Sequence, residues 1–112
     1  MKKIVAIVRS ERLEEIKDAL FAIDVKGITV TQVLGAGNQK GYKEFYRGVE
    51  VNINLLQKTK IEIVTHDEKA EEVIKVIAEN ARTGEIGDGK IFIYNVENVI
   101  RIRTGEQGDK AI

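Results

Sequence analysis

Apolar runs along the chain mark where strands are expected. Residues 3–8, KIVAIV, form an apolar run rich in β-branched side chains, which predicts a buried strand. Residues 58–65, KTKIEIVT, alternate between polar and apolar positions, which predicts a strand with one buried face, carrying Thr59, Ile61 and Ile63. Further strands are expected at residues 28–36, 90–96 and, as a short last strand, 98–103.

Two stretches follow the three-to-four-residue period of an amphipathic helix. The first is residues 11–24, with Ser10 as the expected N-cap and Gly27 shortly after its end. The second is residues 68–82. The apolar stripes of these helices consist of Leu13, Ile16, Leu20 and Ile23 in the first and of Ala70, Val73, Ile74, Ile77 and Ala81 in the second.

A long segment between the second and third strands has no helical period. Residues 37–57, GNQKGYKEFYRGVEVNINLLQ, alternate only near VEVNINL. Loops longer than roughly a dozen residues are uncommon in compact domains, and they are usually functional or mobile. The segment is therefore interpreted as a functional loop, with a plain β-hairpin arm as the alternative.

The order of these elements predicts a single α+β domain over residues 1–112. A β-α-β unit, a long loop and a second β-α-β unit with an added short strand suggest a ferredoxin-like βαββαβ sandwich. Its sheet would be antiparallel, with both helices on one face. We expect a partner subunit to cover the other face, because a large apolar face is seldom left open to water.

Composition narrows the function classes. Lys plus Arg and Asp plus Glu both number 18, and this zero net charge disfavours a general binder of nucleic acids or membrane surfaces. The chain has no cysteine, which excludes disulfides and thiolate metal sites. The first apolar run is too short for a signal-peptide core or a membrane span, so a cytoplasmic protein is expected.

Glycines cluster where two of the expected strands begin or end. Residues 82–90, RTGEIGDGK, contain three glycines and finish with Lys90. Glycines let successive backbone N–H groups point at one anion, although a strand follows here where a P-loop has a helix. A tight helix-to-strand connection is the alternative explanation. Residues 35–41, GAGNQKG, also end a strand with glycines.

The expected last strand, NVIRIR, adds two cations. In a strand, Arg101 and Arg103 share one face, and two guanidinium groups tolerate each other when an anion lies between them. Salt bridges to Asp or Glu are the alternative. His66 is the single histidine, and we expect it to be a solvated turn residue and not a metal ligand.

Two sets of residues together resemble the PII signal-transduction family, the nitrogen regulatory proteins. The first set is ARTGEIGDGKIFI followed by VENVIRIRTGEQGDKAI, and the second is GAGNQKG, YRG and NLLQKTKIEIV. The resemblance covers essentially all 112 residues. It implies a homotrimer of ferredoxin-like subunits whose sheets face inward. It also implies a T-loop at residues 37–55, a phosphate-binding B-loop at residues 82–90 and a C-loop at residues 101–112.

The resemblance implies that ATP or ADP binds in clefts between subunits. In this chain, the residues that match the phosphate contacts are Gly87, Asp88, Gly89 and Lys90, with Arg101 and Arg103 reaching the same phosphates from the neighbouring subunit. Those that match the other side of the nucleotide are Gly35, Gly37 and Gln39, with Ile7, Thr29, Glu62 and Val64 around the base and ribose.

The resemblance also implies that the protein senses 2-oxoglutarate. In relatives, this ligand chelates an Mg²⁺ ion that also touches the ATP phosphates, and Gln39 matches the residue on the metal side. Lys58 matches the residue that pairs with the distal carboxylate. The backbone near Lys40, Gly41 and Gly87 completes the site. A divalent ion suits this arrangement, because a dianion and a polyphosphate otherwise repel each other.

Signalling in the family passes through the T-loop, whose shape depends on the bound ligands. Arg47 matches the loop-tip arginine that contacts targets such as the pore of an ammonium transporter. The resemblance therefore implies an ammonium transporter as the target, which would be the protein's link to the membrane. Glutamine synthetase, nitrogenase and a transcriptional regulator are alternative targets.

A regulator is expected rather than an enzyme. No nucleophile–base pair stands out beside the phosphate loop, where Asp88 is the carboxylate within GDGK. The alternatives are a nucleotide-only energy sensor of the same fold and a small ferredoxin-like nucleotide-processing enzyme.

Three positions depart from the family pattern. Val51 stands where many relatives carry a modifiable tyrosine, and Val49 stands where some carry a phosphorylated serine. We therefore predict control by ligands alone or by an unrelated modification. Asn38 stands where arginine is frequent and contacts phosphate, so nucleotide affinity or the discrimination between ATP and ADP is expected to differ.

Overall fold

The computed structural model describes residues 1–36, 42–46, 49–53 and 55–112, with side chains described outside 37–54. The elements before the long loop are β1 (Lys2–Arg9), the 3-10 turn η1 (Ser10–Arg12), α1 (Leu13–Ala22) and β2 (Ile28–Gly35). The later elements are β3 (Tyr42–Tyr46), β4 (Val49–Ile53), β5 (Leu56–Thr65), α2 (Asp67–Ala81), β6 (Gly89–Asn95) and η2 (Gly108–Ala111).

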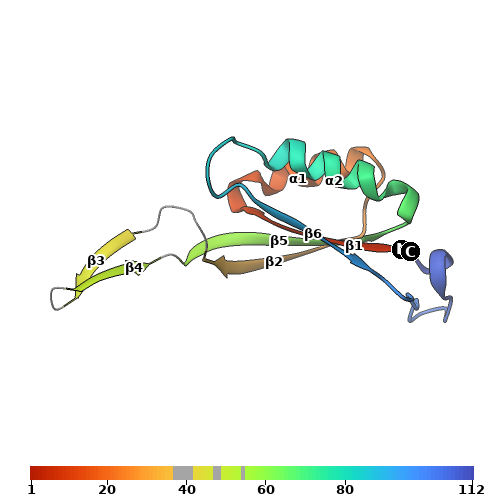
Figure 1. Cartoon of the computed structure of the whole chain (residues 1–112). Helices are drawn as coiled ribbons and strands as arrows, with labels where there is room; N and C mark the ends of the chain where they lie inside the picture. The colour runs from red at the N-terminus through yellow and green to blue at the C-terminus, as the bar shows by residue number, and fades with distance from the viewer. Residues whose placement is uncertain (37–41, 47–48, 54) are drawn as a thin grey trace.

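Four strands form one antiparallel sheet in the order β2-β5-β1-β6. The strand β1 is central, so that Ile4 lies opposite both Ile63 of β5 and Ile93 of β6. Both helices lie on the same side of this sheet (Figure 1). The structure confirms the predicted ferredoxin-like α+β fold. None of the helices in the described ranges is long and apolar enough to cross a membrane.

The core fills the space between the helices and the sheet. Alternate residues of the central strands point into it, and the predicted buried face of β5 is confirmed because Thr59, Ile61 and Ile63 are all buried. Burial of these apolar side chains is the main favourable term in folding. The core residues with the lowest exposure are Ile4, Ala6, Val8, Ile16, Leu20, Ile61, Val73 and Ile77.

The opposite face of the sheet is not covered by any described element. Phe92 and Tyr94 of β6 belong to it, and they remain 44% and 53% exposed. They lie directly opposite Val5 and Lys3 of β1. A hollow of about 490 Å³ on this face is lined by Lys3, Val5, Ile7, Lys60, Glu62, Phe92, Tyr94, Asn95 and Val96. Cover by a partner subunit remains a prediction.

The strands β3 and β4 form a separate two-stranded antiparallel sheet. In its register Tyr42 lies opposite Ile53 and Tyr46 lies opposite Val49. Figure 1 shows this hairpin extending beyond the end of the main sheet where β2 ends and β5 begins. The hairpin alternative therefore describes the backbone at residues 42–46 and 49–53, and a signalling role stays a prediction.

Two local predictions were wrong. Ser10 does not cap the first helix, which enters through η1. Instead, the Ser10 hydroxyl oxygen accepts a hydrogen bond from Thr59 Oγ1 at 2.9 Å and donates one to Gln32 Oε1 at 3.4 Å. These contacts hold the start of the helical segment against the sheet.

The predicted strand at 98–103 is also absent. Ile100 forms only an isolated bridge with Gln107, and residues 102–104 are a turn. The N–H of Gly105 donates to the carbonyl of Arg101 at 2.8 Å, which reverses the chain before a strand can form. Ile102, within this turn, is 99% exposed.

Candidate functional site

Several of the residues predicted to bind nucleotide or 2-oxoglutarate lie at one end of the sheet. Here β1 and β2 end while β5 and β6 begin. Arg9 lies opposite Lys58, and Val8 lies opposite Gly89. Gly35 ends β2 opposite Leu56 at the start of β5. The antiparallel register thus brings together Ile7, Gly35, Lys58 and the B-loop, which are far apart in the sequence.

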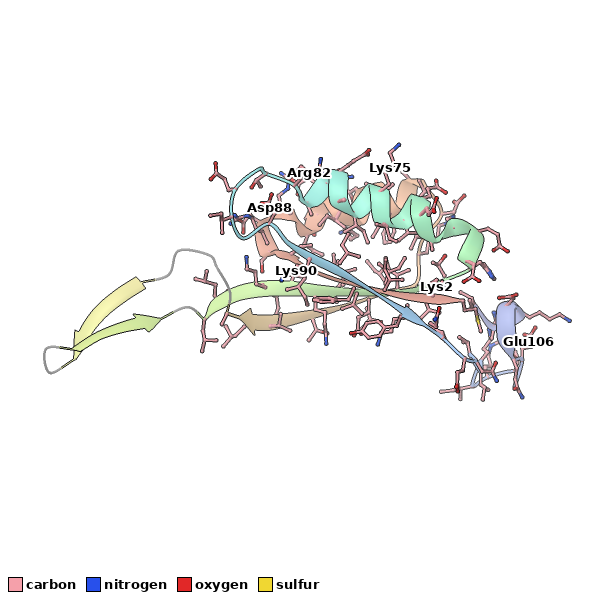
Figure 2. All side chains as sticks on the ribbon, in the orientation of Figure 1. Lys2, Lys75, Arg82, Asp88, Lys90 and Glu106 are labelled. Atoms are coloured by element: carbon pink, nitrogen blue, oxygen red, sulfur yellow. The ribbon has the colours of Figure 1, made fainter. Side chains whose placement is uncertain are left out.

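The carboxylate of Asp88 holds the B-loop closed. It accepts hydrogen bonds from the backbone N–H groups of Thr83 at 2.8 Å and Gly84 at 2.9 Å, and also from the Thr83 hydroxyl. Arg9 Nε lies 3.2 Å from Asp88 Oδ1, the oxygen that also accepts the hydrogen bond of the Thr83 hydroxyl. Figure 2 marks the position of Asp88 in the loop. The Thr83 hydroxyl, followed by these N–H groups and Arg9, holds the pKa of Asp88 well below its usual value.

The carboxylate of Asp88 is therefore occupied within the loop. A negative side chain would repel phosphate, so any contribution of this residue to an anion comes from its backbone N–H. The predicted contact at Asp88 stays a prediction, restricted to the backbone.

Gly89 allows the B-loop to approach β1 closely. Its φ is +111°, and a Cβ atom at this position would lie 1.8 Å from the carbonyl oxygen of Ile7. No side chain fits there without moving the backbone. Gly87, with φ +102°, also has a conformation that favours glycine. The glycines therefore shape a tight connection, which was the alternative explanation, and that shape is compatible with an anion-binding loop.

Two cations hold consecutive carbonyls of the loop. Arg9 Nη2 donates to the carbonyl of Ile86 at 2.8 Å, and Lys58 Nζ donates to the carbonyl of Gly87 at 2.7 Å. Lys58 is only 8% exposed, which is unusual for lysine. Burial, together with the charge of Arg9, lowers the pKa of Lys58.

Lys90 lies beside this loop with its side chain exposed. It is opposite Ile7 in the sheet, so both belong to the face that the helices leave uncovered. Figure 2 shows Lys90 near the start of β6, between the sheet and the B-loop. The position gives the exposed amino group access to a ligand at this end of the sheet.

The residues predicted to surround the base and ribose lie on the same uncovered face. Thr29 is opposite Glu62, and Val64 follows on β5. These three residues line part of a hollow of about 870 Å³ that is also bordered by Lys3, Gly27, His66, Val99 and Ile112. Ile7 lies outside this hollow, nearer to the B-loop.

Arg101 and Arg103 lie at the opposite end of the sheet from the B-loop. The strand β6 starts opposite Val8 and ends opposite Lys2, and the two arginines follow it. The labels of Lys90 and Glu106 in Figure 2 mark the two ends. Arg101 donates to the carboxylate of Glu106 at 2.9 Å and to the carbonyl of Lys110 at 3.2 Å, so the salt-bridge alternative holds for Arg101 within one chain.

Several predicted site residues lie outside the described part of the chain. They are Gly37, Asn38, Gln39, Lys40, Gly41 and Arg47. Among the residues that are described, no group of three His, Asp or Glu side chains could hold a metal ion. The Nδ1 atom of His66 lies 3.4 Å from a carboxylate oxygen of Asp109.

Sequence reasoning missed Arg9 and Thr83. Arg9 contacts a residue 79 positions away, and nothing in its local pattern signals that contact. Thr83 lies five residues before Asp88, and a threonine at that distance from an aspartate in a glycine-rich loop could have indicated a side-chain closure.

Comparisons with known proteins identify the family of the chain. The model of the family described as nitrogen regulatory protein P-II matches residues 1–106. A nitrogen regulatory protein P-II 2 of Methanothermobacter thermautotrophicus is 57% identical over all 112 residues, which cover 97% of that relative. A nitrogen regulatory protein P-II of Rhizobium meliloti is 55% identical, and both chains are covered completely.

Proposed function

The chain belongs to the nitrogen regulatory protein P-II family, and from this premise we propose that it is a homotrimeric signal transducer. It binds ATP or ADP, together with Mg²⁺ and 2-oxoglutarate, and acts on a target protein through residues 37–55. The family is named for regulation and not for a reaction, which confirms the prediction that the chain is not an enzyme.

The arrangement of the B-loop is the observation that carries this proposal. The loop turns its own carboxylate inward, onto Thr83, Gly84 and Arg9. Lys90 remains exposed beside it. A loop with its negative charge satisfied internally and a lysine at its end suits a polyphosphate.

The contact between Lys58 and Gly87 supports the proposed 2-oxoglutarate site. Both residues were assigned to that ligand through the family resemblance, and their atoms lie 2.7 Å apart. A buried ammonium group beside the phosphate loop offers a partner for a carboxylate that enters this end of the sheet. Gln39 is proposed to bind the Mg²⁺ ion that links the two ligands.

The separation of the cationic groups supports a site between subunits. Lys90 lies at one end of the sheet, and Arg101 and Arg103 follow the other end. One copy of the chain therefore does not bring all three to one phosphate group. A neighbouring copy that supplies its arginines to the B-loop completes the site, and the uncovered sheet face provides an interface for it.

Isothermal titration calorimetry tests the ligands directly. ATP and ADP are titrated first, and 2-oxoglutarate is then titrated with Mg²⁺-ATP present and with it absent. Binding of 2-oxoglutarate only in the presence of Mg²⁺-ATP supports the metal-bridged site. Failure of 2-oxoglutarate to bind in either case leaves a nucleotide-only energy sensor, and failure of both nucleotides overturns the proposal.

An ammonium transporter is the proposed target. The protein is expected to bind the purified transporter in a way that depends on whether ADP or Mg²⁺-ATP with 2-oxoglutarate is present, because ligands act through their different affinities for loop states. Arg47→Ala is the variant expected to abolish binding. Because Val49 and Val51 lack a hydroxyl group, ligand control is proposed without modification at these positions.

A further inference from the structure

We propose that Arg9 is a positioning residue of the phosphate-binding loop, which acts with Lys58 to turn the N–H groups of Gly87 and Asp88 toward a bound polyphosphate. This inference rests on the proposed nucleotide-binding function. It adds a residue that neither the glycine pattern nor the family resemblance assigned to the site.

The geometry begins with a pair of neighbouring cations. Arg9 ends β1 and lies directly opposite Lys58 of β5. Two positive side chains at such a pair repel each other unless each has its own acceptor. Here the acceptors are successive carbonyls of the B-loop, those of Ile86 for Arg9 and of Gly87 for Lys58. The pair thus holds one stretch of loop backbone from the sheet side.

Because peptide groups are planar, these two contacts also determine the directions of the N–H groups of Gly87 and Asp88. In a trans peptide the C=O and the following N–H point in opposite directions. The carbonyl of Ile86 points toward Arg9, so the N–H of Gly87 points away from it. By the same reasoning the N–H of Asp88 points away from Lys58. The N–H of Gly87 donates to no described backbone carbonyl outside the helices and strands. The turn at residues 86–87 directs the N–H of Asp88 toward the carbonyl of Glu85, without a hydrogen bond of normal geometry. The two N–H groups remain available to an anion, and successive N–H groups of this kind form an anion-binding nest.

Arg9 has a second contact that lysine could not reproduce at the same time. Its Nε lies 3.2 Å from the carboxylate of Asp88, while its Nη2 reaches Ile86. A planar guanidinium offers several donors in a fixed geometry, whereas an ammonium group is a point charge. Arg9 therefore holds two groups of the loop. One is the Asp88 carboxylate, which closes the loop, and the other is the Ile86 carbonyl, whose direction determines that of the Gly87 N–H.

The chain offers a matched control in Arg12. Its Nε donates to the carbonyl of Asn80 at 2.8 Å, near the end of α2 and outside the B-loop. Arg9→Ala and Arg12→Ala each remove one arginine that binds a distant backbone carbonyl. A purely structural role predicts similar consequences for both, whereas a positioning role predicts that only Arg9→Ala changes ligand affinity.

The experiment measures ATP and ADP dissociation constants by calorimetry, with thermal unfolding recorded for each variant. We expect Arg9→Ala to weaken ATP binding about tenfold or more, the size expected for a lost charged hydrogen bond. Arg12→Ala should stay within about threefold of the wild type. Arg9→Lys should recover part of the affinity, since it keeps the charge but not both contacts. If Arg9→Ala fails to fold, Arg9→Gln provides the same comparison.

The outcomes separate this inference from the proposed function. If the wild type binds ATP and folded Arg9→Ala binds it equally well, the positioning role is wrong and the nucleotide site stands. Equal weakening in Arg9→Ala and Arg12→Ala also contradicts it, because that would reflect general destabilisation. If the wild type binds neither nucleotide, the proposed function fails and the inference fails with it.

Discussion

At the scale of single residues, two glycines of the B-loop both have positive φ but different surroundings. Gly84 has φ +90° and nothing within 4 Å of an added Cβ, whereas Gly89 has φ +111° and the Ile7 carbonyl oxygen at 1.8 Å. Gly84→Ala should cost about 1–2 kcal/mol of unfolding free energy for its φ alone. Gly89→Ala should cost about 3–5 kcal/mol, because β1 and the loop must separate. Urea unfolding measures both, and equal costs would contradict the close approach.

Asp88 gives a prediction for acid conditions. Its pKa is lowered in the folded chain from an ordinary value of 3.8. The stabilisation is therefore fully present above this ordinary value and is lost as pH falls through the lower, folded value. As the pH falls from about 5 to below the folded pKa, the wild type should lose this stabilisation, whereas Asp88→Asn has no carboxylate to protonate. The unfolding free energies of the two proteins should therefore converge at low pH. A constant difference at all pH values would show that the carboxylate charge is not involved.

At the scale of elements, the first helix shows why burial decides the cost of a substitution. Leu20 is completely buried against the sheet, and its neighbour Phe21 is 42% exposed. Leu20→Ala should lower the unfolding free energy by about 2–5 kcal/mol, through lost contacts and the cavity left behind. Phe21→Ala should cost about 1 kcal/mol or less, although it removes more atoms. Denaturant unfolding at one protein concentration gives both values, and similar losses would contradict the assigned burial.

The elements that the sequence predicted well are those in which one face packs against the core, because that packing alone produces the regular spacing of their apolar residues. The helix stripe containing Leu20 and the alternating strand at 58–65 both face the same core, so periodicity alone locates them. Residues 98–103 alternate equally clearly, but none of the strands that the structure describes pairs with them, and the chain instead forms the turn that ends at Gly105. A strand needs a partner as well as a pattern, and sequence periodicity does not reveal the partner.

The candidate site likewise contains residues that local sequence predicts and residues that only the tertiary structure reveals. Gly87, Gly89 and Lys90 could be found because they are adjacent in one glycine-rich segment. Lys58 was predicted through the family resemblance and not through its pattern, since the alternation of β5 assigns it to a polar face. Arg9 could not be found, because its contacts with Ile86 and Asp88 exist only once β1 and β6 are paired. Local sequence therefore locates the loop, and tertiary structure determines what holds it.

At the scale of the whole molecule, one copy of the chain leaves two things incomplete. The sheet face that carries Val5, Phe92 and Tyr94 lacks a covering element among the described residues, although the helices shield the other face. The cationic residues assigned to the phosphates also lie at opposite ends of the sheet. Association of copies through their sheet faces would account for both features. A closed symmetric assembly buries the open face of each sheet, and it brings the B-loop of one chain close to the arginines of its neighbour.

Two phenylalanines of similar exposure test this connection. Phe92 is 44% exposed on the open sheet face, and Phe21 is 42% exposed on α1. Phe92→Glu places a charge in the proposed interface and should convert the proposed trimer into single chains, since burying an unpartnered carboxylate costs several kcal/mol. Phe21→Glu should remain trimeric. Sedimentation velocity distinguishes the single chain of 12.5 kDa from its trimer.

Nucleotide binding should follow the assembly state and not the fold. Phe92→Glu leaves the B-loop, Lys58 and Lys90 in place, yet it should lose ATP binding because the arginines of a neighbouring copy no longer reach the loop. Circular dichroism checks that both variants retain their helices. A folded, monomeric Phe92→Glu protein that binds ATP as tightly as the wild type would show that one chain holds the nucleotide alone, and the site between subunits would then be wrong.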